Sequence, residues 1–483
     1  MKKIILILIV IVVLIIGYNI FNISIYDYIG KDYEDLIPQD YNGINIEKVD
    51  NYNININFLP EQKLCEVKQT IDYINKENED LKQIYFHLYP NAFKEKIVKL
   101  GNIEEPTEDY EPGYIDFKQI EVNEKIVNYE IVGSDYSLLK IELNNVLKPK
   151  ERIKIAMDYI LKVPNIDHRF GYKDNTFNFG NWYPIATVYD QKGWNLSEYY
   201  PIGDPFYSDI SNYNVKITTP SNYIVAASGK IISEEDIENK KVWNIKARLR
   251  RDFAWVVSDK FTKTTHNLKD TQIKLYFLTD HLDLRNFTEE IAVQAMRVFN
   301  NKFGQYPYGQ ISIVETNFLS GGMEYPALVY IDTDSFLSSR KTYLGEYIVH
   351  ELAHQWWYSS VGNNQITDSW LDEGLATYSQ IIFSLEVRGE AYADGLYRNL
   401  MGLYNTNRSN RDILTPVTEF EIWSDYSAVA YGKGAAFLHD IAQKYGSEDL
   451  YNILKIYYSR YKFKNAFSDD FFKIYEEVLG VKY

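Results

Sequence analysis

Apolar residues in the first half of the chain recur with a period of two. The stretch N-I-N-I-N-F at 53–58 alternates polar and apolar side chains, which is typical of a strand with one buried face. Similar stretches follow at 83–89, 126–132, 138–143, 152–161 and 213–218. Turn sequences such as E-P-G at 111–113 separate them, and few helical stretches intervene. The pattern predicts a mainly antiparallel β domain over residues 46–270.

Near residue 280 the period changes to that of a helix. Apolar residues at 287–303 recur at helical spacing, and Gly304 is placed to end that helix. A strand is expected at 311–315. Further helices are expected at 343–360, 370–385, 389–404, 428–445, 448–462 and 467–478. We therefore expect a second domain over 271–483, in which a mixed strand–helix segment leads into a helical C-terminal part.

The first residues form a separate apolar segment. Lys2 and Lys3 precede an unbroken apolar run that continues, with few polar residues, to position 23. A membrane span needs about 20 mostly apolar residues, and residues 4–23 supply them. We expect residues 1–25 to be a transmembrane anchor or uncleaved signal, followed by a polar spacer at 26–45. The lysines would then stay cytoplasmic and the bulk of the chain would be extracytoplasmic; the alternative is a secreted protein released by signal cleavage.

Composition excludes several classes of function. The 483 residues carry a net charge of −16 without a basic tract, so nucleic acid is not an expected partner. The single cysteine, Cys65, excludes an internal disulfide and a cysteine-based zinc site. His87 and His168 lack any partner pattern, and we interpret both as structural.

The strongest chemical signal is H-E-x-x-H at 350–354, followed by Glu373. On a helix His350 and His354 project from one face. Zinc takes imidazole and carboxylate ligands, and a catalytic site keeps one position open for water. Glu351 lies beside that face and can reach such a water. Glu373, on a second helix, completes a set of two histidines and one carboxylate, so the sequence predicts a site for one Zn²⁺ ion.

Several other stretches, in this order along the chain, complete a resemblance to a known family. They are R-D-F-A-W at 251–255, F-G-Q-Y-P-Y at 303–308, G-G-M-E-Y-P at 321–326, H-Q-W-W at 354–357 and Y-G-K-G at 431–434. Together with the metal motif they resemble the gluzincin zinc aminopeptidases of the aminopeptidase N family, also called membrane alanyl aminopeptidase-like. The resemblance covers about residues 170–483. It implies an α+β multidomain fold, with an N-terminal β-sandwich-like domain followed by a thermolysin-like zinc peptidase domain.

The resemblance also implies roles for individual residues. Glu351 would be the general base, Tyr431 would hydrogen-bond the oxyanion with Tyr426 in support, and Glu324 would bind the substrate's free α-amino group. The peptide would lie along Gly321, Gly322 and Met323. Tyr325 stands where the family has an asparagine, which leaves the local hydrogen bonding of this loop to be established.

The family commonly has a long helical domain after the catalytic one, whereas this sequence ends at Tyr483. We therefore expect a short form in which that domain is absent or supplied by a partner. A cluster of aromatic residues and glycines at 168–207 has two interpretations, either an aromatic core with loops or a wall of the substrate site.

The resemblance implies a zinc metallopeptidase that removes the N-terminal residue of peptides through a zinc-activated water. The substrates would be peptides with a free N-terminus. One alternative is a zinc endopeptidase with an open cleft, and another is a non-catalytic, zinc-stabilised surface module that binds peptides. Epoxide hydrolysis, known in the same family, is the least favoured because nothing in the sequence indicates a lipid pocket.

Overall fold

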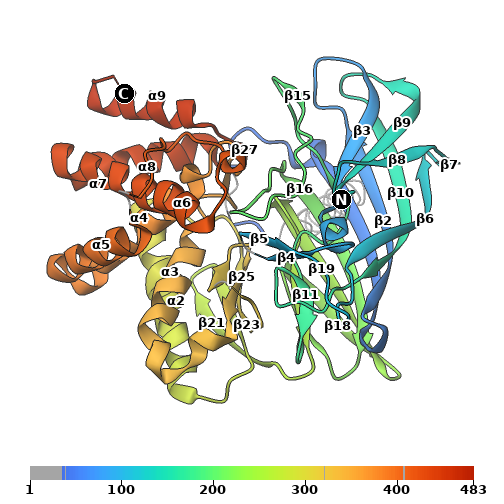
Figure 1. Cartoon of the computed structure of the whole chain (residues 1–483), viewed down its shortest axis with the longest axis horizontal. Coiled ribbons are helices and arrows are strands. Elements are labelled where there is room, and N and C mark those ends of the chain that lie inside the picture. Colours follow the sequence, from blue (N-terminus) through green and yellow to red (C-terminus); the bar gives the residue numbers. More distant parts are fainter. Residues whose placement is uncertain (1–34, 38–39, 100, 320, 406–407, 483) are drawn as a thin grey trace, which may run out of the picture.

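The computed structural model describes residues 35–37, 40–99, 101–319, 321–405 and 408–482. The expected anchor at 4–23 lies outside these residues. Within the part of the chain that is described, no helix is long and apolar enough to cross a membrane. Figure 1 shows a β-rich half formed by the first part of the chain and a helical half formed by the second.

An eight-stranded sheet is the largest element of the β-rich half. Its neighbouring strands run antiparallel, except that β1 and β16 run parallel. The alternation along β1 buries Tyr52, Ile54, Ile56 and Phe58, as the period of two predicts. In sheet order the strands are β18 (Lys230–Ile237), β19 (Lys240–Arg250), β16 (Ser211–Pro220), β1 (Asp50–Leu59), β2 (Leu64–Ile74), β10 (Arg152–Lys162), β6 (Tyr114–Val122) and β7 (Lys125–Ile126).

Two four-stranded sheets complete this half around an aromatic core. Phe179 stacks on Trp255 with ring centroids 3.8 Å apart, and Trp182 packs edge-on to both rings. Part of the aromatic cluster at 168–207 is therefore core. The sheets are β11 (Phe170–Lys173), β12 (Thr176–Phe179), β20 (Trp255–Ser258) and β17 (Ile224–Ala227), and β13 (Ile185–Ala186), β3 (Leu81–His87), β9 (Leu138–Leu147) and β8 (Tyr129–Val132). Small ribbons pair β4 (Ile97–Lys99) with β5 (Asn102–Glu104) and β14 (Tyr189–Asp190) with β15 (Gly193–Trp194).

A five-stranded mixed sheet lies beside the helices of the second half. Its order is β21 (Thr262–Leu268), β22 (Thr271–Phe277), β23 (Gln310–Thr316), β25 (Leu328–Asp332) and β24 (Gly322–Met323). The short edge strand β24 runs antiparallel to β25. The expected domain boundary at 270 falls in the turn of the β21–β22 hairpin, so this sheet takes its first strand from before that boundary.

Eight α-helices are described in this half, one of them (α6) not expected from the sequence, and the shared core is made from helix faces together with the buried face of β22, β23 and β25. They are α2 (Leu282–Lys302), α3 (Lys341–Ala353), α4 (Trp370–Arg388), α5 (Glu390–Tyr404), α6 (Trp423–Ser427), α7 (Gly434–Tyr445), α8 (Ser447–Tyr461) and α9 (Ser468–Leu479). A parallel pair, β26 (Val361–Gly362) and β27 (Lys464–Asn465), ties the chain after α3 to the segment before α9.

Two expected helices differ from the structure. The helix expected at 343–360 ends at Ala353, because the chain turns back: the backbone N–H of Ser359 bonds to the carbonyl of His354, and that of Val361 to the carbonyl of Trp356. The helix expected at 428–445 begins with a π-helical turn, η7 (Ala428–Lys433), before α7. Such turns are frequent at functional sites, and this one carries Tyr431.

Candidate metal centre and peptidase site

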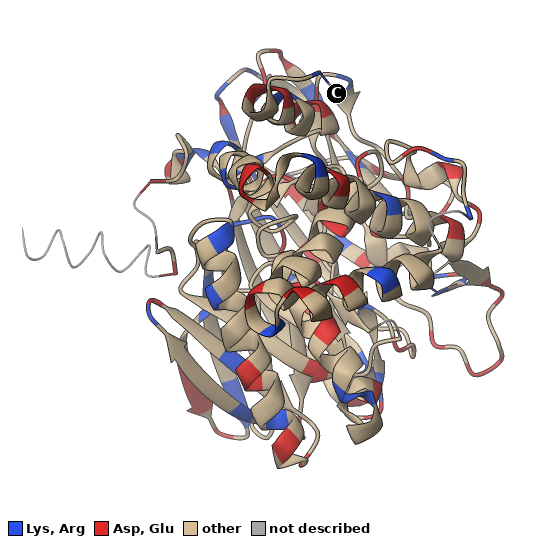
Figure 2. Cartoon of the chain, turned by 90° about the vertical axis from the view of Figure 1, so that its left-hand side faces the viewer, with Lys and Arg blue, Asp and Glu red and all other residues tan. Residues whose placement is uncertain are grey.

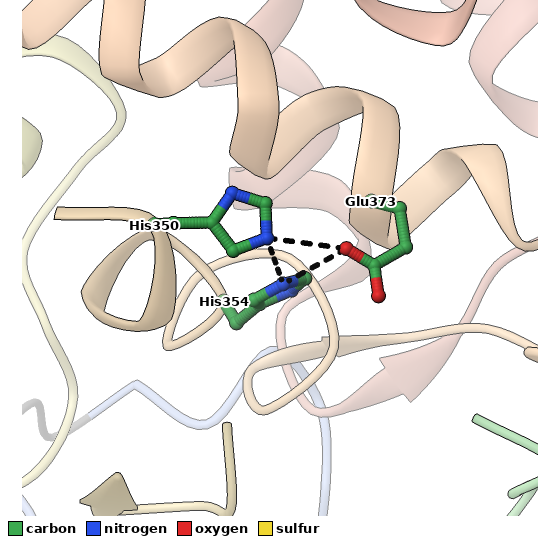
Figure 3. A group of neighbouring side chains, drawn as sticks. All are labelled: His350, His354 and Glu373. Atoms are coloured by element: carbon green, nitrogen blue, oxygen red, sulfur yellow. Dashed lines mark hydrogen bonds and ion pairs between the residues drawn. The ribbon is translucent and has the colours of Figure 1, made fainter. Parts of the chain in front are cut away.

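His350, His354 and Glu373 converge on one point between α3 and α4 (Figure 3). The two Nε2 atoms are 3.1 Å apart, and they lie 3.2 and 3.4 Å from Oε2 of Glu373. Three corners of a tetrahedron with bonds of about 2.0–2.1 Å to a central zinc would be about 3.3–3.4 Å apart. The three donor atoms therefore occupy positions that fit three corners of a tetrahedral zinc site. All three side chains are buried.

The second ring nitrogen of each histidine fixes which nitrogen faces the metal position. Nδ1 of His354 lies 3.1 Å from the carbonyl oxygen of Trp357, so it must carry the proton. Nδ1 of His350 lies 3.4 Å from Oε1 of Gln380, whose Nε2 donates to the carbonyl of Glu346. With those protons on Nδ1, both Nε2 atoms can present their lone pairs to a cation bound between them.

A close approach of two glycines brings the remaining site elements together. A Cβ added to Gly374 in α4 would lie 2.8 Å from the Cα of Gly434 at the start of α7. Larger residues at either position would separate α4 from η7. This contact explains the second glycine of Y-G-K-G, and it places the ring of Tyr431 parallel to that of His350 at a centroid distance of 5.8 Å.

Glu351 lies against the edge strand β24. A Cβ added to Gly322 would lie 2.4 Å from its Oε1, so the glycine leaves room for the carboxylate. Its Oε2 is buried and has no hydrogen-bond partner among the described residues. One carboxylate oxygen of Glu351 also forms a group with ligand atoms of Glu324 and His354 that lie within 4.8 Å of one another. Glu351 is therefore placed to exchange a proton beside the metal position.

Glu324 follows β24 and is buried with a second carboxylate from the β-rich half. Single oxygens of Asp204, Glu324 and Glu373 lie within 4.8 Å of one another. Nε2 of Gln365 donates to Oε1 of Glu324 at 3.2 Å and to Oδ2 of Asp372 at 2.7 Å. The loop that carries Glu324 is thus held by a hydrogen bond to the helical half.

Burial and mutual repulsion shape the charge of this group. Burial raises the pKa of Glu351 well above its usual value, and Glu324 adds to the shift while His354 opposes it. Burial and the Asp204 carboxylate raise the pKa of Glu324. Burial would also raise the pKa of Glu373, but the two histidines outweigh it and hold that pKa below its usual range. A crowded set of carboxylates of this kind favours cations, whether a metal or an ammonium group.

Tyr325, at the position of the family's asparagine, ties the same loop to the β-rich half. Its hydroxyl donates to Oδ1 of Asn181 at 2.7 Å, and Nδ2 of Asn181 donates to Asp252 at 2.9 Å. A Cβ at Gly180 would overlap the Tyr325 hydroxyl. Tyr325 therefore makes a direct hydrogen bond between the two halves of the molecule.

The structure brings together the residues singled out in the sequence and adds others. The expected ligands, Glu351, Glu324 and Tyr431 share one site, and Tyr426 packs edge-on to Tyr431 at 6.0 Å. Five residues of the site were not predicted from the sequence: Arg169, Asp204, Gln365, Asp372 and Gln380. Asp372 was detectable beside Glu373, and Asp204 lies in the aromatic segment for which a substrate-site wall was one interpretation.

Comparisons with known proteins agree with this geometry. Residues 287–482 match the Peptidase family M1 domain. Human endoplasmic reticulum aminopeptidase 2 is 23% identical over 67% of this chain and 35% of its own length. Mouse aminopeptidase B is 29% identical over 36% of this chain and 28% of its own length. The chain thus spans well under half the length of these curated relatives.

Solved structures share the fold over most of the chain. The M1 zinc metallopeptidase from Deinococcus radiodurans, in two crystal structures of which one is a mutant bound to a Tyr-Ser-Ala substrate, gives a TM-score of 0.63 at 16% identity. The likeness covers 90% of this chain and 91% of that one. Zn²⁺ is the metal of this family, and the donor set of His350, His354 and Glu373 fits it. The chain therefore carries a peptidase family M1 domain at residues 287–482, in line with its resemblance to the gluzincin zinc aminopeptidases.

Proposed function

We propose that the protein is a zinc aminopeptidase that removes the first residue of peptides with a free N-terminus. The observation that carries the proposal is the position of Glu324. Its carboxylate lies within 4.8 Å of ligand atoms of Glu351 and His354, and also of Glu373. A carboxylate so close to the metal position accepts hydrogen bonds from an ammonium group, and this limits cleavage to the first peptide bond.

Zinc, when bound by His350, His354 and Glu373, polarises a carbonyl and makes a water more acidic. Glu351 accepts a proton from the attacking water while the water oxygen bonds to the scissile carbonyl carbon. The same carboxyl group then gives a proton to the leaving nitrogen as the C–N bond breaks. Burial raises the pKa of Tyr431 well above its usual value. The hydroxyl therefore stays protonated and can donate a hydrogen bond to the carbonyl oxygen.

The test uses the full chain loaded with zinc and short peptides that carry either a free or an acetylated N-terminus, with products identified by mass. Loss of single residues from free peptides alone is the expected result. Internal cuts in both sets would establish an endopeptidase. Zinc binding without any cut would favour a non-catalytic peptide-binding module.

Replacing the amine-binding residue sharpens this test. Glu324→Gln keeps the shape and the acceptor for Gln365 but removes the charge, and it should lower kcat/KM on free peptides by at least tenfold. A Glu324→Gln enzyme that cleaves free peptides as well as the parent would contradict the exopeptidase assignment.

We further propose that residues 4–23 anchor the protein in a membrane with the catalytic part outside the cytoplasm. The support is the apolar run after Lys2 and Lys3. The full chain should sediment with membranes and resist extraction by carbonate, whereas a chain beginning at residue 30 should not. Recovery of the full chain in the soluble fraction would contradict the anchor.

A further inference from the structure

The first described residues of the chain, 35–37, pair with the loop that precedes β23. Leu36 and Tyr308 make an antiparallel bridge. Two backbone hydrogen bonds of 2.9 Å flank it, from the N–H of residue 37 to the carbonyl of 307 and from the N–H of 309 to the carbonyl of 35. The chain is therefore fixed to the helical half before the β-rich half begins at β1.

Asp35 connects this segment to the β-rich half. Its Oδ2 accepts a hydrogen bond from the backbone N–H of Arg248 in β19 at 2.7 Å and lies 3.5 Å from Nη2 of Arg250. The Arg250 side chain is fully buried, with its guanidinium carbon 3.2 Å from the centroid of the Tyr308 ring. Loss of one partner from a buried ion pair is strongly destabilising, so Asp35 is needed where β19 meets the helical half.

Residues 41–44 bind the end of α8. Nδ2 of Asn42 donates to the carbonyls of residues 460 and 462, at 2.8 and 3.0 Å. Tyr41 packs edge-on to Phe463 with ring centroids 6.4 Å apart, and Ile44 packs against the core of the helical half. We call residues 35–37 and 40–44 the strap. The strap contacts β19, the loop before β23 and the end of α8, which are distant from one another in the sequence.

The strap lies within the stretch 26–45, which the sequence predicts to be a polar spacer, and it shortens the free part of that spacer. Between the apolar run that ends at residue 23 and Asp35 lie residues 24–34, which span at most about 40 Å when fully extended. A spacer that stayed free to residue 45 would span about 80 Å. Docking of the strap thus halves the distance that the body can move from an N-terminal anchor.

Surface charge offers no second attachment on the face drawn in Figure 2. Acidic and basic residues are interspersed over the helices of this face. Attraction to anionic lipid requires clustered basic residues. For this face, the position of the body relative to a membrane therefore depends on the connection through the chain.

We propose that the strap clamps the two halves of the molecule together and makes the N-terminal anchor a short tether that enters the body at one fixed point. The catalytic body then stays close to the membrane surface and acts on peptides that are present there. The clamp follows from contacts of the described residues, whereas the tether rests on the membrane anchor proposed above.

Hydrogen exchange followed by mass spectrometry tests the clamp in the full chain. Peptides that cover residues 35–44, 245–250 and 305–310 should exchange at least a hundredfold more slowly than an unstructured chain. Exchange of 35–44 at the rate of an unstructured chain would overturn the proposal.

Three variants test which contacts hold the strap. Asp35→Asn removes the charge but keeps an acceptor for the N–H of Arg248, and it should speed exchange at 35–37 and 307–309 at least tenfold while α3 stays unchanged. Asp40→Asn is the matched control, because Asp40 is exposed and asparagine can still accept from the N–H of Asn42. Asn42→Ala removes the bonds to α8 without unpairing a charge and should speed exchange at 40–44. Unchanged exchange in Asp35→Asn and Asn42→Ala, or equal acceleration in α3, would overturn the clamp.

Two insertions in the full chain test the tether in lipid vesicles. Ten glycine and serine residues are inserted either after residue 30 or after residue 38, and a dye on Gln305→Cys reports energy transfer to acceptor lipids. Gln305 is exposed and lies two residues before Pro307, whereas the native Cys65 is fully buried and stays unlabelled. The insertion after 30 should lower the transfer efficiency at least twofold, and the insertion after 38 should leave it unchanged.

The outcomes separate the strap from the anchor. Equal losses of energy transfer with both insertions would indicate a free spacer and overturn the strap. No effect of either insertion would mean that other contacts hold the body at the membrane, and it would overturn the tether. No transfer in the parent would contradict the anchor and with it the tether, while slow exchange of 35–44 would still support the clamp.

Discussion

Tyr431 presents its ring parallel to His350, with planes inclined by 11°, and packs against Tyr404 and Tyr426 as well. These contacts restrict the ring to one orientation. Nothing in the residue type distinguishes it from the other tyrosines among the 43 in the chain. Its proposed role follows from the position that α4 and η7 give it.

Replacing Tyr431 by phenylalanine should remove one hydrogen bond to the oxyanion while keeping the packing. We expect kcat to fall by about 10²–10³-fold, with zinc content unchanged, as measured by initial rates and metal analysis. Tyr343, 56% exposed on α3, supplies the control, since Tyr343→Phe should retain full activity. A kcat within threefold of the parent in Tyr431→Phe would remove Tyr431 from the mechanism.

His87 illustrates a different effect of burial at the residue scale. Its ring stacks on Tyr89 at 4.7 Å, and its Nδ1 has no hydrogen-bond partner in the described ranges. Burial lowers the pKa of His87 to about 3. Because the unfolded chain takes up this proton near pH 6.5, the neutral ring costs no stability above that pH. Stability is lost progressively as the pH falls from 6.5 towards 3.

His87→Phe should remove this part of the acid sensitivity. Between pH 7 and pH 5 the parent should lose about 2 kcal/mol more unfolding free energy than the variant, measured by urea denaturation at both pH values. His281 is exposed, so His281→Phe should keep the parent's dependence. Equal losses in parent and His87→Phe would show that the ring is not held neutral.

At the scale of elements, the site depends on how closely β24 approaches α3. Gly322 lies directly against the Glu351 side chain, and there is no room for a Cβ at this position. The G-G-M-E sequence therefore has a steric explanation at this position, beyond the resemblance that first identified it. The edge strand also fixes how far Glu324 lies from the metal ligands.

Gly322→Ala should displace the Glu351 carboxylate and lower kcat at least tenfold while leaving zinc bound, as judged by rates and metal analysis. Gly402, in α5, has no atom within 4 Å of an added Cβ. Gly402→Ala should keep full activity and stabilise the helix by up to about 1 kcal/mol. Full activity in Gly322→Ala would show that β24 can move away from α3 without consequence.

At the scale of the whole molecule, the metal centre lies within an apolar core that the helices form with the five-stranded sheet. The frame of α3, α4 and α7 is held by this core and by the contact of Gly374 with Gly434. We therefore expect the domain to fold without the metal, and the metal to bind to a site that is already formed.

Removal of zinc by a chelator should abolish peptidase activity and leave the far-UV circular dichroism unchanged. The melting temperature should fall, because zinc at a hundredfold its Kd contributes about 2.7 kcal/mol. Restored zinc should restore activity. Loss of helical signal on chelation would instead identify a structural zinc and favour the binding-module alternative.

Much of this organisation was predictable from sequence because it depends on local periodicity and spacing. The alternation along β1, the helical spacing of α2 and the four-residue separation of His350 and His354 are properties of neighbouring residues. The two helices that differ from expectation do so where tertiary contacts override the local pattern. α3 stops at Ala353 because the following turn satisfies its last carbonyls, and the π-helical turn η7 arises where α4 crosses at Gly374.

The sequence by itself determined the two halves, the metal ligands and the residues that the family motifs identify. Tertiary structure alone decided which distant side chains join them. Asp204 and Arg169 come from the β-rich half and Gln365 from the loop before α4, and no periodicity or spacing connects them with His350. The physical reason is that burial, close approach of backbones and electrostatic coupling among carboxylates depend on distances in space, which the order of residues along the chain does not contain.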